Sequence, residues 1–164
     1  MITLKPLTKE DLNYRVNLLN HDAIAPHINT KELFTIEKTE IWFERIKDSD
    51  TRKDFVFVFN DRNVGMGGLT NVSKANRNCE LYMYIDPSFH GKGLGYKFCF
   101  ELCKYAFDDL DLEKVYLYTF SENIPANKLY EKIGFKLEGV LRNHTFKNGL
   151  LRNRNFYGLL KNEL

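Results

Sequence analysis

The sequence of 164 residues has little excess of either charge and no long apolar run. Its formal net charge is only +2, from 24 Lys and Arg against 22 Asp and Glu, which disfavours a dedicated nucleic-acid binder. The longest unbroken apolar runs, such as 55–59 and 81–85, span five residues, whereas a transmembrane helix needs about 20. We therefore expect neither a nucleic-acid partner nor a membrane span.

Cysteine is also scarce. The three cysteines, Cys79, Cys99 and Cys103, cannot all pair, and no C-x-x-C motif occurs, which disfavours both a disulfide framework and a cysteine-rich zinc site. Cys99 and Cys103 lie four positions apart in a predicted helix without an evident activating partner. We expect reduced, mostly buried thiols, no covalent enzyme intermediate and no bound metal.

The N-terminus, Met1–Pro6, lacks the basic region and long apolar stretch of a secretory signal. A cytoplasmic protein is therefore expected. The length suits one buried core and is short for two, so residues 1–164 are predicted to form a single domain.

The hydrophobic pattern predicts a mixed α/β sheet. Extended runs are expected at residues 2–4, 55–59, 64–72, 79–85, 115–119, 135–141 and 151–160. Helices are expected to begin near Thr8, Thr35, Gly95 and Pro125. The segment 20–34 is expected to be an irregular surface loop. The cluster Gly65-Met66-Gly67-Gly68 precedes no helix and indicates a strand that bends or lies close to a neighbour or a substrate.

A second glycine cluster, His90-Gly91-Lys92-Gly93-Leu94-Gly95, lies between a predicted strand and a predicted helix. Glycines there let a backbone approach a ligand closely, and the free amides and dipole of a helix start attract a phosphate. A tight structural turn is an equal alternative. The cluster is not a Walker loop, because Gly93 follows the Gly-Lys pair, nor a Rossmann fingerprint, because Tyr96 replaces the sixth-position glycine.

Two blocks carry a family resemblance. His90-x-x-Gly93-x-Gly95 is similar to Gln/Arg-x-x-Gly-x-Gly/Ala at a helix start, with His90 as the departure. The block 123–135, NIPANKLYEKIGF, is similar to Asn-x-x-Ala-x-x-Leu-Tyr-Glu-x-x-Gly-Phe. From Cys79 to Phe135 the chain thus resembles the GNAT superfamily of acetyl-CoA-dependent N-acetyltransferases. The order of elements and the C-terminal tail resemble the branch of ribosomal-protein N-terminal, spermidine and bacterial amino-sugar acetyltransferases.

The resemblance implies a mixed, mostly antiparallel sheet, flanked by helices, with a V-shaped split between the strands that end near Ile85 and Thr119. The pantetheine arm of acetyl-CoA would insert into the split. Contacts with acetyl-CoA are then expected from three groups. These are the backbone of Met83, Tyr84 and Ile85, the diphosphate-binding segment His90, Gly91, Lys92, Gly93, Leu94, Gly95 and Tyr96, and the polar side chains Asn123 and Asn127.

Acetyl transfer from a thioester to an amine needs a neutral amine and a proton for the departing thiolate. The resemblance assigns the acid to Tyr130, whose alternative role is that of a core tyrosine on an amphipathic helix. Glu80 interrupts an otherwise apolar and aromatic strand and is the first candidate for the base, with an exposed edge carboxylate as the alternative. Tyr82 and Tyr118 could line the substrate cleft or simply pack the sheet.

The C-terminal tail is basic, with Arg142, Lys147, Arg152, Arg154 and Lys161 and no acidic residue between 139 and 162. It could be a solvated hairpin face or a ligand site. A polyamine site would instead need carboxylates, so a nucleotide-linked amino sugar or a protein N-terminus fits the tail better.

We therefore predict an acetyl-CoA-dependent N-acetyltransferase that acts on a small-molecule or peptide primary amine by direct attack in a ternary complex. The alternative is a noncatalytic CoA-sensing or protein-binding module on the same fold. Small enzymes of this kind often pair, so a homodimer is also expected.

Overall fold

The computed structural model describes residues 1–30 and 32–164 and contains one seven-stranded sheet in the order β1-β2-β3-β4-β5-β7-β6. The strands are β1 Ile2–Pro6, β2 Lys53–Phe59, β3 Arg62–Ser73, β4 Asn78–Ile85, β5 Lys114–Phe120, β6 Lys136–Lys147 and β7 Leu150–Leu160. The α-helices are α1 Leu12–Asn20, α2 Ile36–Ile46, α3 Leu94–Lys104 and α4 Ile124–Ile133. The predicted mixed, mostly antiparallel sheet flanked by helices is confirmed.

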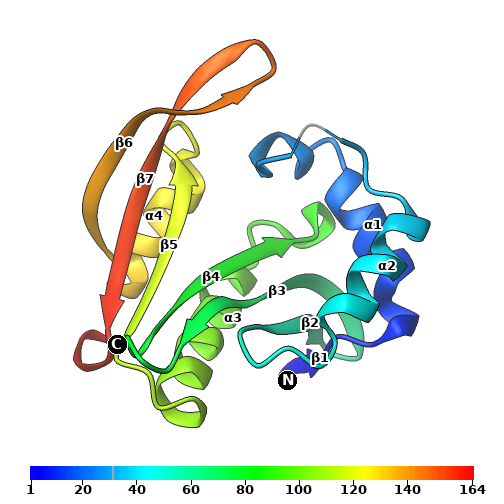
Figure 1. The fold of residues 1–164 in the computed structure, drawn as a ribbon, viewed down its shortest axis with the longest axis horizontal. Coiled ribbons are helices and arrows are strands. Elements are labelled where there is room, and N and C mark those ends of the chain that lie inside the picture. Colours follow the sequence, from blue (N-terminus) through cyan, green and yellow to red (C-terminus); the bar gives the residue numbers. More distant parts are fainter. Residues whose placement is uncertain (31) are drawn as a thin grey trace.

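The sheet divides between β4 and β5, its parallel pair. These strands pair only at Asn78–Lys114, Cys79–Val115 and Glu80–Tyr116, and beyond Glu80 they no longer pair. Figure 1 shows the two strands side by side at one end and diverging towards the other, with β5, β7 and β6 forming a separate wing. The predicted V-shaped split is therefore present between the two central strands.

Alternation along β2 buries both faces of that part of the sheet. Phe55 and Phe57 belong to the core that includes α3 and α4, and the Phe57 ring stacks on Phe98 with centroids 4.5 Å apart. Val56, which points the other way, packs with Met66 against α1. The helices thus hold the strands before the split firmly on both sides.

The segment 20–34 has two buried residues that the sequence did not predict. It contains a short 3-10 helix, Ala25–His27, and the side chains of Ile24 and Ile28 are buried against α1 and the sheet. Most of the other described residues of this segment are exposed and irregular, so it is a surface loop, as predicted, that two apolar residues anchor. Lys31, within the same prediction, lies outside the described residues.

The cluster Gly65–Gly68 lies in β3. Of the roles expected for these glycines, the structure shows close packing against neighbouring strands. A Cβ added to Gly67 would lie 2.6 Å from the carbonyl oxygen of Tyr82 and 2.5 Å from Cζ of Phe57. Added side chains at Gly65 and Gly68 would also meet backbone carbonyls of the adjacent strands. The glycines allow β2 and β4 to pack tightly on β3, which fixes the position of β4.

We expect Gly67→Ala to destabilise the fold by roughly 1–3 kcal/mol, because neither the Tyr82 carbonyl nor the stacked Phe57 ring can yield freely. Thermal unfolding should show a midpoint lowered by several degrees. Gly139→Ala is the matched control, since an added Cβ there meets nothing within 4 Å. Equal midpoints for the two variants would contradict the packing role of Gly67.

The three cysteines are free and buried, as predicted. Burial is the main reason why the pKa of Cys79 is raised to about 12, with smaller contributions from Cys103 and Glu80. A thiol with such a pKa is protonated at neutral pH and is a poor nucleophile. Within residues 1–30 and 32–164, none of the helices has the length and apolar character needed to span a bilayer.

Candidate functional site

The edge of β4 that faces the split carries Met83, Tyr84 and Ile85. On its other side this stretch pairs with Gly67, Met66 and Gly65 of β3 in regular antiparallel register. Its β5 side is unpaired beyond Glu80, so its backbone groups there lack a strand partner. An extended ligand bearing amides, such as a pantetheine arm, can pair with such an edge.

His90 closes the end of this edge. Its Nε2 lies 2.8 Å from the carbonyl oxygen of Ile85, so the side chain turns back onto the strand. That carbonyl is therefore already engaged by the protein, and the edge open to a ligand is centred on Met83 and Tyr84. The residue that departs from the family motif thus has a local structural role.

The turn before α3 provides backbone amides without intrachain partners. Gly91 and Gly93 have φ of 75° and 72°, and an added Cβ at either position would meet nothing within 4 Å. Gly93 is the N-cap of α3 and provides no side-chain cap, and the first backbone hydrogen bond runs from the Lys97 amide to the Gly93 carbonyl at 3.3 Å. The left-handed turn, the open space and the free amides together form a cradle for an anion.

The other residues of this segment have different surroundings. Gly95 faces α4, where an added Cβ would lie 2.8 Å from Cδ1 of Leu129. Leu94 is buried in the core, so only its backbone can reach a ligand. The Nζ atom of Lys92 lies 4.9 Å from the centroid of Phe89, and Tyr96 stacks on Phe100. Gly91 and Gly93 therefore face open space, whereas Gly95 allows α3 and α4 to pack closely.

Tyr130 lies on α4, behind the split. Its ring packs edge-on against Phe135 with centroids 5.7 Å apart, and the side chain is 9% exposed. Burial, and to a smaller extent Cys99, Tyr84 and Cys103, raises the pKa of its hydroxyl above the ordinary value. The phenol therefore stays neutral and carries its proton across the physiological pH range.

Glu80 is the last residue of β4 that pairs with β5, so it lies at the point where the split begins. Its Oε2 accepts a hydrogen bond of 2.8 Å from Nδ2 of Asn71. Strand alternation puts Glu80, Tyr82 and Tyr84 on the face opposite the buried Cys79 and Leu81. Glu80 is thus a carboxylate held at the apex of the split on the face that α1 and α2 partly cover.

Asn123 and Asn127 hold α4 in place through protein contacts. The Oδ1 atom of Asn123 accepts a 3.4 Å hydrogen bond from the Ala126 amide and caps the helix. Asn127 is buried, and its Nδ2 donates to the carbonyls of Phe120 and Ser121 at 3.3 and 3.1 Å. Asn123 thus fixes where α4 begins, and Asn127 fastens the helix, and hence Tyr130, to the end of β5.

The comparisons with known proteins agree with this geometry. The family model described as an acetyltransferase (GNAT) domain matches residues 1–136. The chain belongs to the GNAT acetyltransferase family. The resemblance found in the sequence is thereby confirmed, as is the expectation of an acetyl-CoA-dependent N-acetyltransferase.

Relatives within this family differ in their named acceptors. The chain is 32% identical over 154 residues to spermidine N(1)-acetyltransferase of Escherichia coli (strain K12), covering 93% of this chain and 82% of the relative. It is 35% identical over 99 residues to the putative ribosomal N-acetyltransferase YdaF of Bacillus subtilis (strain 168), covering 60% and 54%. A crystal structure of spermidine N-acetyltransferase from Vibrio cholerae in complex with CoA and spermine superposes with a TM-score of 0.94, at 26% identity, covering 99% and 96%.

In this GNAT chain two basic residues of the tail, Lys147 and Arg152, are engaged in contacts within the protein, while Arg142 is exposed. Lys147 is buried, and its Nζ donates to the carbonyls of Ala25, at 2.6 Å, and Ile28. Arg152 pairs with Glu122 at 3.0 Å. The Lys147 contacts fasten the tip of the β6–β7 hairpin to the segment after α1, and the Arg152 pair fastens β7 to the turn between β5 and α4. Neither contact was predicted from the sequence.

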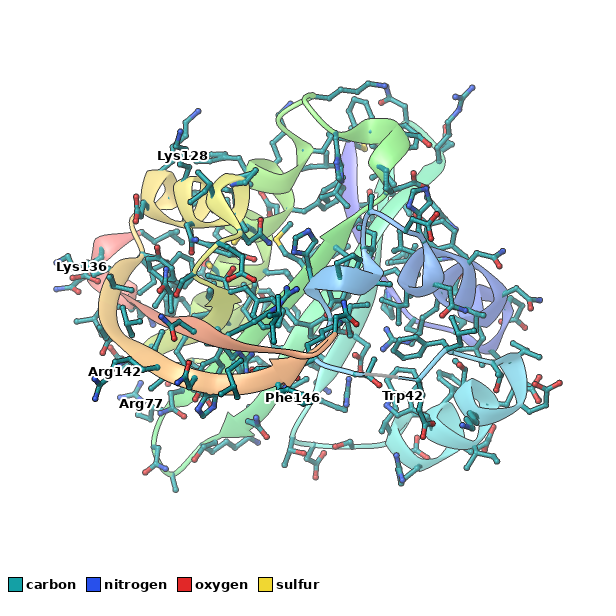
Figure 2. All side chains as sticks on the ribbon, turned by 90° about the horizontal axis from the view of Figure 1, so that it is seen from above. Trp42, Arg77, Lys128, Lys136, Arg142 and Phe146 are labelled. Atoms are coloured by element: carbon teal, nitrogen blue, oxygen red, sulfur yellow. The ribbon has the colours of Figure 1, made fainter. Side chains whose placement is uncertain are left out.

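A polar cluster beside β4 of the GNAT fold was not predicted from the sequence. Arg15 of α1 and Arg52 both lie over the ring of Trp42, with guanidinium carbons 4.2 and 5.1 Å from its centroid. Figure 2 labels Trp42 on α2, on the side of the molecule away from Lys128 of α4. The available signal was Arg15 itself, a cation on the helix stripe that also contains Leu12 and Leu19.

Tyr82 lies beside this cluster. Its hydroxyl donates to Oδ1 of Asp54, so Tyr82 contributes to the face beside the split instead of only packing the sheet. Tyr118, on β5, packs against Phe156. The guanidinium carbon of Arg154 lies 4.7 Å from the centroid of the Tyr118 ring. Among the described residues there is no group of His, Cys, Asp or Glu side chains that could hold a metal ion.

Proposed function

We propose that this chain transfers the acetyl group of acetyl-CoA to a primary amine by direct attack in a ternary complex. The observation that carries the proposal is the coincidence of three features around one opening. These are the unpaired edge of β4, the amide-rich turn at Gly91–Gly93 and the buried neutral phenol of Tyr130. Together they fit a thioester whose amide-bearing arm ends in a diphosphate.

Each part of the site has a separate binding role in this proposal. The turn and the free amides of residues 94–96 would hold the diphosphate, aided by the dipole of α3. The backbone of Met83 and Tyr84 would pair with the amides of the arm, and His90 would keep the strand end in place. Acetyl-CoA supplies an activated acyl group on a sulfur leaving group.

Proton transfers are assigned to Glu80 and Tyr130. Glu80 would accept the proton that the amine must lose before or during attack on the carbonyl carbon, directly or through water. As the carbon–nitrogen bond forms and the carbon–sulfur bond breaks, Tyr130 would donate its proton to the departing thiolate. Its raised pKa keeps this proton in place until the thiolate develops. Asn123 and Asn127 act as positioning residues for Tyr130 through α4.

The acceptors that we propose from the sequence are a nucleotide-linked amino sugar and a protein N-terminus. Polyamines are a further candidate class, because some relatives are named for acetylating them. We propose that the enzyme works in the cytoplasm, where its free thiols stay reduced. Exposed apolar side chains on β6 and β7, such as Leu137, Val140 and Leu151, support a homodimer, which the molecular mass in solution would test.

The test is a two-substrate kinetic measurement with purified protein. Release of free CoA thiol should require both acetyl-CoA and an amine, and reciprocal plots should intersect, as for a ternary complex. Parallel lines would contradict direct attack, because they indicate an acetylated enzyme. Acetyl-CoA binding without thiol release across peptides, polyamines, aminoglycosides and nucleotide amino sugars would favour the alternative, a noncatalytic CoA-sensing module.

A further inference from the structure

A small cavity of about 150 Å³ lies beside the free part of β4, on the same sheet face as Glu80. Two arginines line it together with aromatic and aliphatic side chains. Its lining consists of Arg15, Arg52, Leu19, Ile28, Phe34, Tyr82 and Tyr84. A larger cavity of about 450 Å³ adjoins it and shares Leu19, Ile28 and Phe34. The two cavities thus form one continuous cleft, whose β4 end is the small cavity between α1, the segment after it and β4.

Arg15 is the unusual member of this lining. Its side chain is nine-tenths buried, and its Nη1 has no hydrogen-bond partner within the part of the chain that the structure describes. No carboxylate among those residues forms a salt bridge with it. Its guanidinium group instead forms a cation–π contact with the ring of Trp42. Lys31, outside the described residues, carries a cationic side chain and would not neutralise it. A buried charge without a counter-ion is costly, which indicates that an anionic partner is missing.

The second arginine is already neutralised. The Nε and Nη2 atoms of Arg52 donate to the two carboxylate oxygens of Asp54, both at 2.7 Å. The Tyr82 hydroxyl donates to the same carboxylate. Arg52 and Asp54 therefore cancel, and the cavity retains the single positive charge of Arg15.

The position of Tyr84 connects this charge to the reaction centre. Tyr84 lines the cavity and belongs to the free edge of β4, along which the arm of acetyl-CoA is proposed to pair. Burial raises the pKa of Tyr84 itself, while Arg15 lowers it and Glu80 raises it further. Glu80 lies on the same face of β4 as Tyr82 and Tyr84, and Arg15 lines the cavity with both tyrosines, so a carboxylate and an unpaired guanidinium share one face beside β4. This arrangement suits a substrate with a positive and a negative end.

We propose that the acetyl acceptor is an amino-carboxylate, whose carboxylate binds Arg15 in the small cavity while its amine lies near Glu80. This inference rests on the proposed acetyl transfer and names its substrate class. One unpaired guanidinium matches one carboxylate in charge, and the planar fork of arginine matches its two oxygens. The apolar walls suit the carbon chain between the two groups. A polyamine would instead bring a second cation towards Arg15.

The test compares acceptors that differ in one end group. Glycine, β-alanine, 4-aminobutanoate and 5-aminopentanoate are each assayed by CoA thiol release against the diamine or neutral amine of matching length. The inference requires at least one amino-carboxylate to exceed its matched diamine by about tenfold or more in kcat/KM. Diamines that equal or exceed every amino-carboxylate would overturn it. Preference for O-phosphoethanolamine over β-alanine would also overturn it, in favour of a phosphate.

Two variants locate the preference. Arg15→Met keeps much of the side-chain length over Trp42 but removes the charge, and should lower kcat/KM for the preferred amino-carboxylate roughly 10- to 100-fold. The same variant should leave neutral amines within about threefold of the wild type. Arg15→Lys should restore part of the preference. A uniform loss with all amines in both variants would indicate a purely structural role and contradict the proposal.

Arg77→Met is the matched surface control. Arg77 is half-exposed, pairs with Asp111 and Glu113, and lies well apart from Trp42 in Figure 2. It should leave the preference between acceptors unchanged. A change in preference equal to that of Arg15→Met would overturn the assignment to Arg15.

Binding without turnover separates the two proposals. Trp42 is the single tryptophan, so its fluorescence reports on the cavity when pentanoate, which has no amine, is titrated. A saturable change in the wild type that is at least tenfold weaker in Arg15→Met is expected. If pentanoate binds in this way but no amine is acetylated, acetyl transfer fails and the carboxylate site stands. If neutral amines are acetylated but pentanoate gives no response, the carboxylate site fails and acetyl transfer stands.

Discussion

Tyr130→Phe should lower kcat by about 100-fold or more while leaving the affinity for acetyl-CoA nearly unchanged. The proposed role of the hydroxyl is to give a proton to the departing thiolate, and a positioned acid of this kind contributes about 10²–10⁴-fold. Its ring packs against Phe135 and Tyr157, and phenylalanine preserves both contacts. Single-turnover rates and calorimetric titration with acetyl-CoA measure the two quantities separately.

Tyr157→Phe is the matched control for this prediction. The Tyr157 hydroxyl donates to Oε1 of Glu131 at 3.0 Å, on the same core cluster as Tyr130. Its loss should cost roughly 1 kcal/mol of stability and little turnover. If Tyr130→Phe keeps the wild-type single-turnover rate, or if both variants lose turnover equally, Tyr130 is a core tyrosine and not the acid.

Gly93→Asp should weaken acetyl-CoA binding at least tenfold relative to Gly93→Asn. Both residues tolerate a left-handed backbone better than most, and the space beside Gly93 is open, so the two variants differ mainly in charge. The aspartate carboxylate would repel the diphosphate and compete for the free amides at the start of α3. The comparison therefore isolates the anion from the strain of replacing a glycine with φ of 72°.

Calorimetric dissociation constants for the two variants and the wild type measure this effect. Thermal unfolding controls for folding, since an N-cap aspartate should not destabilise α3 more than asparagine does. Equal affinities of Gly93→Asp and Gly93→Asn would mean that the diphosphate binds elsewhere.

Elements whose signals are local in the chain were predicted well. The Thr35 side chain caps α2 by accepting a hydrogen bond from the Lys38 amide, and Gly134, with φ of 123°, ends α4. Asn148 and Gly149 form the turn of the closing hairpin with positive φ values. These features depend on a few consecutive residues, so their physical cause is visible in the sequence.

Contacts between distant segments were not predictable in the same way. Lys147 was assigned to a basic tail, whereas its partners, the carbonyls of Ala25 and Ile28, lie more than a hundred positions earlier. The burial of Ile24 and Ile28 within the surface segment 20–34 was not predicted for the same reason. Burial there depends on how the hairpin and α1 meet in space, which no local pattern encodes.

The candidate site likewise contains parts that local motifs predicted and parts that depend on contacts between distant segments. The family motifs located the turn at Gly91–Gly93 and Tyr130, and the strand pattern located the edge of β4. The cluster of Arg15, Arg52 and Asp54 was missed, because its members come from α1 and from the start of β2 and the residue before it, and meet only in the folded chain. Acceptor recognition is therefore the part of the function that needed the structure.

Amide hydrogen–deuterium exchange, with and without acetyl-CoA, tests most directly whether the split between β4 and β5 is where the donor binds. Protection should appear in peptides that cover the free edge at 83–85 and the turn and helix start at 91–96, while β1 and β2 remain unchanged. If acetyl-CoA binds and protects other segments but leaves both of these exchanging as before, the split is not the donor site, and the mechanism built on it is wrong.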